Sequence, residues 1–501
     1  MKHKIALFLL ICGLLAFVPC AKQAWSAGAP ASNSASKPST QPADPQKVAR
    51  QVEEINGKVQ KLFERKEYAK CKDLLEQLIK LAPTYDVAWY NLACLQSRIH
   101  QPKQAVESLN KAVDLGYTEL QFMEHDPDLE AIRDTKGFKD LLARRDDIQR
   151  QRGVKIEAEL KTQYGKNYIC AIDHEHKLVF ATNIDQRTLD EVKAQLTAEA
   201  KALWGDLFEH KPEQYLTVII PSEEDVKNLP AQVGGFFNPE SNRLVARQIG
   251  VTLRHEFTHA MHWGDQQARG QNHVIWVMEG LAGLDENATF SGGHIHPEPN
   301  TRLNALQRVL QGKREMSWKN LFEASQPLFM RNAMVTYPES RYVMMYFYQK
   351  GKLREWYLTY CKMFEKDPSG IGATEKVFGK KLGEIEADWK KWVTSLAPLP
   401  EHPNKAYLGV SLKGDADGVE IRDIVPGSGA DKAGLQPKDV ILKVGSLRTV
   451  DIDKLIEFVA KQAVGSVVMV EYRRDGKYEK VQVTLSAVPT DSRPARPRKK
   501  K

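Results

Sequence analysis

The sequence predicts a multidomain α+β protein, in which a block of paired helices precedes a mixed helix-and-strand domain and a smaller β-rich domain. Its 501 residues are enough for about three domains. Apolar residues recur with helical spacing from Val48 onwards, and strand-like patterns begin after Arg152. Pro398–Pro403 separates the last β-rich stretch from the rest. The composition, 42% hydrophobic and 27% charged, is that of a globular protein and excludes a collagen-like, coiled-coil or largely disordered chain.

The first residues have the pattern of a secretory signal peptide. Basic Met1–Lys4 precedes the apolar run Ile5–Pro19, which is too short to span a bilayer comfortably, and small residues follow. We therefore expect a signal peptide over 1–26 and an exported protein, either in the bacterial periplasm or secreted. An uncleaved anchor is the alternative. No later segment approaches 18 uninterrupted apolar residues, so the sequence predicts no transmembrane segment after signal removal.

The net charge of +8 is concentrated at the two ends of the chain. Three lysines contribute +3 before residue 30, and the last eleven residues contribute +5. The body between them is neutral, which argues against nucleic acid as a partner. We expect a disordered linker over 27–46 and a disordered basic tail over 489–501. Burial as small hydrophobic residues is expected, in preference to a disulfide, for Cys71, Cys94, Cys170 and Cys361.

Residues 47–150 are predicted to form helix–turn–helix units. Small and apolar residues that let paired helices approach closely recur at the offsets of a 34-residue unit: Trp89, Leu92, Ala93, Ala105, Leu109 and Ala112, with Cys71 and Leu75 one unit earlier. This pattern resembles tetratricopeptide repeats, and the resemblance implies a protein partner for the block. Two units are fewer than a stable solenoid usually needs, so we expect the block to cap itself or to pack on the next domain.

The domain over 155–398 is predicted to begin with strands and to continue with helices as far as Trp392. Its Gly234–Pro239 segment is either a plain turn or an edge strand along which a substrate backbone pairs. The other expected elements are a hairpin of Tyr168–Ile172 and Lys177–Ala181, a helix over Leu189–Phe208, a strand over Tyr215–Ile220, a short acidic helix capped by Ser222 and a strand over Leu244–Arg247.

The strongest chemical signal in the chain is His255-Glu256-Phe257-Thr258-His259. On a helix, positions i and i+4 lie on one face, so both imidazoles can reach one cation. Glu256 lies between them, placed to accept a proton from water that the cation activates rather than to bind the cation. Gly264 is expected to end this helix.

A catalytic zinc ion takes three protein ligands and keeps one position open. The metzincin arrangement would place a histidine six residues after His259, but Asp265 stands there. The alternative is a carboxylate on a following helix, and Glu279 in Glu279-Gly280-Leu281-Ala282 lies 20 residues beyond His259. The combined pattern resembles the gluzincins, the thermolysin-like zinc peptidases, and Gly234–Pro239 adds a similarity to the bacterial peptidase-MA-like families.

This resemblance covers roughly 155–395 and implies one zinc ion per chain, held by His255, His259 and Glu279, with Glu256 as general base. Related enzymes place a hydrogen-bond donor for the tetrahedral oxyanion on a later helix. Tyr337, at the expected start of a helix, matches that position, and a tyrosine with no catalytic role is the alternative.

A carboxylate usually orients a zinc-bound histidine. Glu286, seven residues after Glu279 and on the same helical face, is the candidate here. Thermolysin-like enzymes use the position four residues on, which is Gly283 in this chain. His262 is expected to pack or to support a ligand. The remaining histidines are expected in a solvated hairpin turn (His174, His176) and in a mobile loop (His294, His296).

The last domain, over 406–488, has a pattern of its own. Tyr407-Leu408-Gly409-Val410 is followed by Pro426–Leu435 and Arg474–Lys477. These segments resemble PDZ domains of the bacterial HtrA protease type. The resemblance implies that an extended peptide adds as a strand, with backbone N–H groups near Leu408–Val410 holding its terminal carboxylate. A helix about Asp453–Gln462 would form the other wall, and a purely structural appendage is the alternative.

The sequence therefore predicts an exported zinc metallopeptidase that acts on peptides or proteins, with PDZ and repeat modules recognising substrates or partners. One alternative is a catalytically inactive peptidase-like scaffold that binds peptides through those modules. The complete ligand set and the presence of Glu256 favour the enzyme. A structural zinc ion is a second alternative, although such sites usually have four protein ligands, often cysteines.

Overall fold

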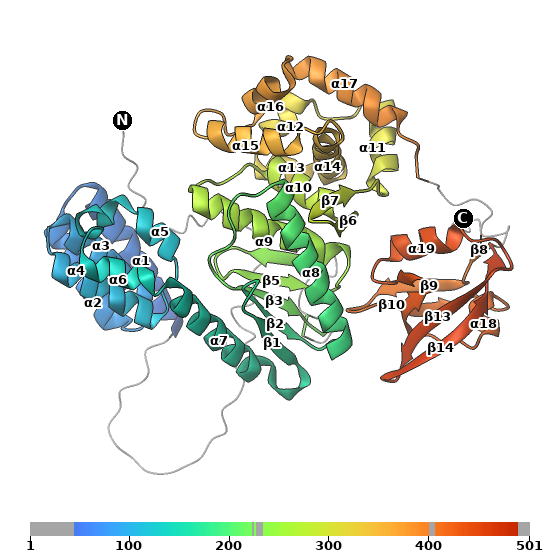
Figure 1. Cartoon of the computed structure of the whole chain (residues 1–501), viewed down its shortest axis with the longest axis horizontal. Helices are drawn as coiled ribbons and strands as arrows, with labels where there is room; N and C mark the ends of the chain where they lie inside the picture. Colours follow the sequence, from blue (N-terminus) through green and yellow to red (C-terminus); the bar gives the residue numbers. More distant parts are fainter. Residues whose placement is uncertain (1–44, 223–224, 227–233, 400–405, 489–501) are drawn as a thin grey trace, which may run out of the picture. The chain divides into compact units, whose positions relative to one another are not determined.

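The computed structural model of the chain describes residues 45–222, 225–226, 234–399 and 406–488 (Figure 1). The chain divides into two compact units, Met1–Arg152 and Gly153–Lys501. The expected signal peptide, nearly all of the linker, the basic tail and most of the acidic helix after Ser222 lie outside the described residues. Within the described part of the chain, no helix combines the length and the apolar character that crossing a membrane requires.

The first unit is built from paired helices, as predicted. It buries the small and apolar residues of the expected repeat, because short side chains let α3 and α4 pack against each other. Trp89 is only half-buried. The helices are α1 (Pro45–Glu64), α2 (Tyr68–Leu81), α3 (Asp86–Arg98), α4 (Pro102–Leu115), α5 (Leu120–His125), a 3-10 turn (Pro127–Ile132) and α6 (Lys136–Ala143). The next helix, α7 (Arg145–Tyr164), contains the domain boundary that we expected between residues 150 and 155.

The second unit begins with a five-stranded mixed sheet in the order β1-β2-β3-β5-β4. The predicted hairpin is present as the antiparallel pair β1–β2, and the predicted strand near Leu244–Arg247 pairs antiparallel with β4, whereas β2, β3 and β5 run parallel. The strands are β1 (Ile169–Asp173), β2 (Leu178–Thr182), β3 (Leu216–Ile220), β4 (Gly235–Asn238) and β5 (Arg243–Ala246). This order leaves β4 at one edge of the sheet.

The central strands are buried on both faces. Phe180 and Val218 point toward α8 (Gln186–Asp206) and α9 (Val251–Arg269), which cover one face (Figure 1). Val179 and Ile219 point the other way and pack with Leu160 of α7. Continuous apolar runs such as Leu216–Ile220 are what parallel strands need when both faces are covered.

A helical layer completes the second domain. Its core is aromatic, with Trp276, Trp318, Trp356 and Trp389 fully buried. The helices are α10 (Ile275–Asp285), α11 (Arg302–Gln311), α12 (Trp318–Phe322), α13 (Gln326–Arg331), α14 (Ala333–Gln349), α15 (Leu353–Met363), α16 (Ile371–Phe378) and α17 (Leu382–Ser395). The helix expected to start at Tyr337 therefore begins earlier, at Ala333, and Pro338 lies inside it.

Two predictions from local sequence are wrong because residues far away in the sequence pack against the segment concerned. Gly264 does not end α9, which continues to Arg269 and stops at the left-handed Gly270 (φ 62°). Gly264 is instead buried where Pro212 packs, and a Cβ there would lie 2.7 Å from Pro212 Cγ.

The histidines expected in a mobile loop lie in a hairpin of β6 (Ala288–Ser291) and β7 (His294–Pro297). The carboxylate of Asp206, the last residue of α8, holds this hairpin. It accepts the Ile295 N–H (2.7 Å) and lies 2.8 Å from His294 Nδ1. The sequence around the hairpin does not reveal the contact, because Asp206 lies 88 residues before His294.

Residues 406–488 contain an antiparallel sheet of their own, in the order β14-β13-β11-β10-β9, with β12 on β11. The wall helix predicted near Asp453–Gln462 is α19 (Ile452–Ala460), and β9 is an edge strand. The other elements are β8 (Ala406–Tyr407), β9 (Val410–Gly414), β10 (Val419–Ile424), α18 (Gly429–Lys432), β11 (Val440–Val444), β12 (Leu447–Arg448), β13 (Val467–Arg474), β14 (Lys477–Thr484) and β15 (Ser486–Ala487).

The close packing of α10 on α14 yields a stability prediction. A Cβ at Gly280 would lie 2.9 Å from Ser340 O and from Met344 Cγ. We expect Gly280→Ala to destabilise the protein by about 1–3 kcal/mol, because overpacking outweighs the better helix propensity of alanine. Gly383→Ala on α17 is the matched control, since no atom lies within 4 Å of its Cβ position. Thermal unfolding of both variants checks the prediction, and an equal change in midpoint would contradict it.

Candidate functional site

Helices α9 and α10 bring the three expected zinc ligands together. His255 Nε2 and His259 Nε2 are 3.1 Å apart. Glu279 Oε2 lies 3.3 Å from the first nitrogen and 3.7 Å from the second. Among the described residues, this is the group of metal-binding side chains whose donor atoms all lie within 4.8 Å of one another. All three side chains remain partly accessible to solvent.

The donor set fits a zinc ion. Glu279 Oε2 is buried, and no described residue gives it a hydrogen bond of satisfactory geometry. Such an oxygen is costly unless it has a partner, which a cation would provide. Two imidazole nitrogens and one carboxylate oxygen match a zinc site that keeps a fourth position open.

Glu286 lies on the other side of the first imidazole. Its Oε1 is 3.2 Å from His255 Nδ1, so Nε2 is the nitrogen that faces the other two donors. Burial opposes protonation of His255, but the carboxylates of Glu279 and Glu286 outweigh burial and raise its pKa to about 10. Burial likewise opposes ionisation of Glu279, yet His259 and His255 lower its pKa well below the usual range. Zinc binds neutral imidazole, so zinc binding would compete with this proton.

The edge strand β4 positions Glu256. The backbone N–H of Phe237 donates to Glu256 Oε2 at 2.9 Å. This approach of strand to helix requires Gly235, where a Cβ would lie 2.6 Å from both Val245 O and Thr252 Cγ2. Of the two alternatives for Gly234–Pro239, the structure contains the edge strand.

Gly283 stands at the position where thermolysin-like enzymes have the carboxylate that orients a histidine, and an arginine contacts its carbonyl group here. The buried guanidinium of Arg341 donates to the carbonyls of Gly283 and Leu284, the latter at 2.9 Å. The carboxylate comes instead from Glu286, directly after α10. Arg302 Nη2 lies 2.5 Å from Glu286 Oε1. Sequence reasoning missed Arg302, because no motif or spacing distinguishes it from other surface arginines.

Tyr337 is close enough to the cluster to respond to its charges. Burial raises the pKa of its hydroxyl above the usual value, and the carboxylates of Glu279 and Glu256 raise it further. The guanidinium carbon of Arg302 lies 5.4 Å from the centre of its ring. Its hydroxyl donates to Met330 Sδ at 3.6 Å. The catalytic role expected for Tyr337 stays a prediction.

A buried polar network joins the helices that carry His255, His259 and Glu279. The Thr258 hydroxyl lies 2.9 Å from Asp285 Oδ2 on α10 and 3.3 Å from Glu199 Oε1 on α8. Burial raises the pKa values of both carboxyl groups, and the charge of Asp285 raises that of Glu199 further. Arg254 Nη2 donates to the Glu286 carbonyl at 2.6 Å. No sequence pattern points to this network, because its members belong to three separate helices.

The other histidines have structural partners. His262 is buried, stacks on Phe208 and places Nε2 2.8 Å from His273 Nδ1, which confirms the expected packing role. His174 and His176 lie in the turn between β1 and β2, as expected, but both side chains are less exposed to solvent than predicted. There His176 contacts Asp173 at 2.9 Å and His174 contacts the Tyr215 hydroxyl at 2.7 Å.

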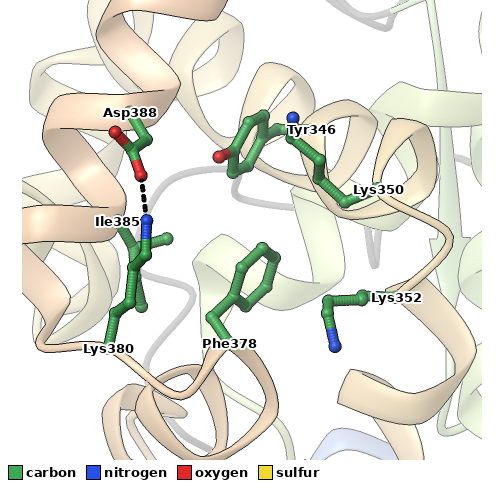
Figure 2. Close-up of a pocket in the computed structure, with 7 residues that line it drawn as sticks. All are labelled: Tyr346, Lys350, Lys352, Phe378, Lys380, Ile385 and Asp388. Atoms are coloured by element: carbon green, nitrogen blue, oxygen red, sulfur yellow. Dashed lines mark hydrogen bonds and ion pairs between the residues drawn. The ribbon is translucent and has the colours of Figure 1, made fainter.

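A separate hollow of about 240 Å³ lies in the helical layer (Figure 2). Its lysines follow the carboxyl ends of α14 and α16, where positive charge offsets the helix dipoles. Lys380 pairs with Asp388 at 2.6 Å, and Lys352 donates to a carbonyl of α16 at 2.8 Å. The candidate metal ligands do not line this hollow. It is formed by Tyr346, Lys350, Lys352, Phe378, Lys380, Ile385 and Asp388.

The two elements expected to flank a bound peptide in the last domain, the edge strand β9 and the helix α19, contact each other. The segment of Tyr407, Leu408, Gly409 and Val410 leads into β9, where the carbonyls of Leu408 and Gly409 accept N–H groups of Ala430 (2.9 Å) and Val425 (2.8 Å). Gly409 has φ +87°, and a Cβ there would lie 2.1 Å from Ser428 Cβ. Partly buried apolar side chains of both elements pack against the core of this domain: Val410 and Leu412 on β9, Ile452 and Phe458 on α19.

Comparison with known proteins identifies this last domain. Residues 406–485 match the PDZ domain family. The C-terminal domain is therefore a PDZ domain. A PDZ domain with an edge strand such as β9 supports recognition of peptides or protein termini.

Individual relatives match only part of the chain. A chloroplastic protein of Arabidopsis thaliana is 33% identical over 95 residues, or 18% of this chain and 26% of that protein. The HtrA-type protease AlgW with decapeptide is 19% identical over 21% of this chain and 35% of that chain, with a TM-score of 0.17. The HtrA3 PDZ domain bound to a phage-derived ligand is 22% identical over 17% of this chain and 89% of that chain, with a TM-score of 0.16. The chain thus spans about a quarter of that curated relative and a third of the AlgW chain.

Gly409 provides a test of the groove. We expect Gly409→Ala to weaken binding of a peptide with an apolar C-terminus by about tenfold or more, because the methyl group would collide with Ser428 and alanine is strained at the positive φ of Gly409. Gly427→Ala is the matched control, since its φ is also positive (+75°) but its Cβ position is open. Fluorescence anisotropy on the full chain measures both affinities. Equal affinities would place the peptide elsewhere.

Proposed function

We propose that this chain is a zinc metallopeptidase of the gluzincin type, exported from the cell, whose PDZ domain recruits peptide or protein substrates. The observation that carries the proposal is the convergence of His255, His259 and Glu279 beside Glu256, which an edge strand orients. A helical motif alone would supply two ligands. The third comes from a different helix and arrives within reach of both imidazoles.

The chain's own groups have separate tasks in this proposal. Zinc, when bound, would acidify a water molecule and polarise the peptide carbonyl. Glu256 accepts the proton of the attacking water and passes it to the leaving amine. Glu286 holds His255 so that Nε2 faces the site. Burial opposes ionisation of Glu286, but His255 and then Arg302 outweigh it and lower the pKa of this carboxyl group. The edge strand β4 aligns an extended substrate backbone beside Glu256.

The details of the site favour an enzyme over the two alternatives. A structural zinc site would use a fourth protein ligand, whereas the cluster contains three. An inactive scaffold would not require Glu256, whose carboxylate the Phe237 amide orients next to His255 in the sequence. The PDZ domain is compatible with both readings, because it recognises peptides in either case. Metal content and hydrolysis therefore decide the question.

Metal analysis tests the ligand set. We expect one zinc ion per wild-type chain and a loss of zinc affinity by orders of magnitude in His259→Ala and in Glu279→Gln, because each removes one of three protein ligands. His296→Ala is the control, since this exposed imidazole lies on β7, outside the cluster. Full zinc occupancy in His259→Ala would disprove the assignment.

Removal of the general base separates metal binding from chemistry. We expect Glu256→Gln to retain zinc and thermal stability but to lose hydrolysis by about 10²–10⁴-fold, because an amide of the same size cannot accept the proton. Glu240→Gln, an exposed glutamate just after β4, is the control. Turnover of an unstructured peptide is the measurement. If wild-type protein binds zinc but cleaves nothing, the scaffold reading holds instead.

A further inference from the structure

The buried hydroxyl group of Thr258 on α9 has more hydrogen-bond acceptors around it than it has protons. Its Oγ lies 2.9 Å from Asp285 Oδ2 on α10 and 3.3 Å from Glu199 Oε1 on α8. The carbonyl oxygen of Arg254, one turn earlier on α9, is 3.1 Å away. A hydroxyl group donates one proton, so it can serve only one of these three oxygens. At least one of the remaining contacts therefore requires a proton from another group.

The two carboxyl groups beside this hydroxyl are the groups that can supply the proton. Both side chains are buried, and no described residue donates a hydrogen bond to Glu199 Oε2 or to Asp285 Oδ1. Two ionised carboxylates with so few donors would be costly inside a protein. Burial raises the pKa of both groups, and the charge of Asp285 raises that of Glu199 further. One proton retained by the pair removes the repulsion and provides the missing donor.

The charges around the pair indicate which carboxyl group keeps the proton. The guanidinium groups of Arg341 on α14 and Arg254 on α9 favour the ionised form of Asp285. His255, also on α9, acts on Asp285 in the same direction. At Glu199, the positive charge of Arg254 is opposed by the negative charge of Asp285. Ionised Asp285 is thus better stabilised than ionised Glu199, which makes Glu199 the holder of the proton.

We propose that Glu199 is a neutral carboxylic acid that donates its proton to Thr258 Oγ, while Thr258 donates its own proton to ionised Asp285. The contact of Thr258 with Asp285 is the shorter of the two, as expected for donation to an anion. This chain of donors runs from α8 through α9 to α10. Glu199 is therefore a positioning residue, which holds the helix of the two imidazoles against the helix of Glu279. Its effect on zinc binding rests on the proposed function, whereas its protonation state does not.

A matched pair of amide substitutions in the full chain tests the direction of this chain. Glu199→Gln keeps a donor for Thr258, so we expect an unfolding midpoint within about 2 °C and a zinc affinity within about twofold of wild type. Asp285→Asn removes the anion that accepts from Thr258, so we expect the midpoint to fall by about 4 °C or more and zinc affinity by about tenfold or more. Thermal unfolding and zinc titration are the measurements. Equal changes in the two variants, or the reverse order, overturn the inference.

Infrared spectroscopy measures the proton directly. The carbonyl group of a carboxylic acid absorbs at a higher frequency than a carboxylate, and we expect wild-type protein at neutral pH to show one such band that Glu199→Gln lacks. Absence of this difference overturns the inference, as does failure of Glu199→Gln to fold, because a neutral acid should tolerate replacement by its amide. Infrared and unfolding measurements require neither zinc nor hydrolysis. If wild-type protein binds no zinc, the proposed function fails, and these two measurements still decide the protonation state.

Discussion

The hydroxyl group of Thr258 connects three helices around the candidate metal ligands His255, His259 and Glu279. It contacts Asp285 on α10 and Glu199 on α8, while its own helix α9 carries His255 and His259 on either side of it. Buried polar groups are expensive unless their partners are in place, so this network allows little variation in the angle between helices. That angle determines whether Glu279 reaches the two imidazoles. The geometry of the candidate site therefore depends on a contact that includes none of its ligands.

Both domains of the second unit place their candidate binding site beside an edge strand. Strand β4 ends the mixed sheet next to Glu256, and β9 ends the PDZ sheet next to α19. An edge strand offers backbone donors and acceptors to another chain, which is a hazard in most proteins and a means of recognition in some. Each edge depends on a glycine that permits close packing, Gly235 in the first case and Gly409 in the second. Recognition through the backbone at both sites suits extended polypeptide.

Much of the local structure could be predicted from the sequence, because local patterns produce it. The strand β3 and the β1–β2 hairpin were predicted from their apolar patterns, and both are present. The His255–His259 spacing predicted that two imidazoles share one helix face, and the structure brings them within 3.1 Å. The prediction that Gly264 ends α9 was wrong. A glycine can end a helix, but it can also leave room inside a helix for another segment to pack closely, as Pro212 does against Gly264.

The sequence by itself determined the candidate groups of the site: a pair of imidazoles on one helix and a carboxylate between them. These follow from residue type and short spacing, which depend on backbone periodicity. The PDZ domain at the carboxyl end was predicted from the resemblance of its motifs to that family. Only the tertiary structure decided which distant groups complete the site. Arg302, Glu199 and Asp206 are ordinary charged residues in the sequence, and they acquire partners because the packing of α8, α10 and α11 carries them there. Contacts of this kind form between segments far apart in the chain, so no local pattern encodes them.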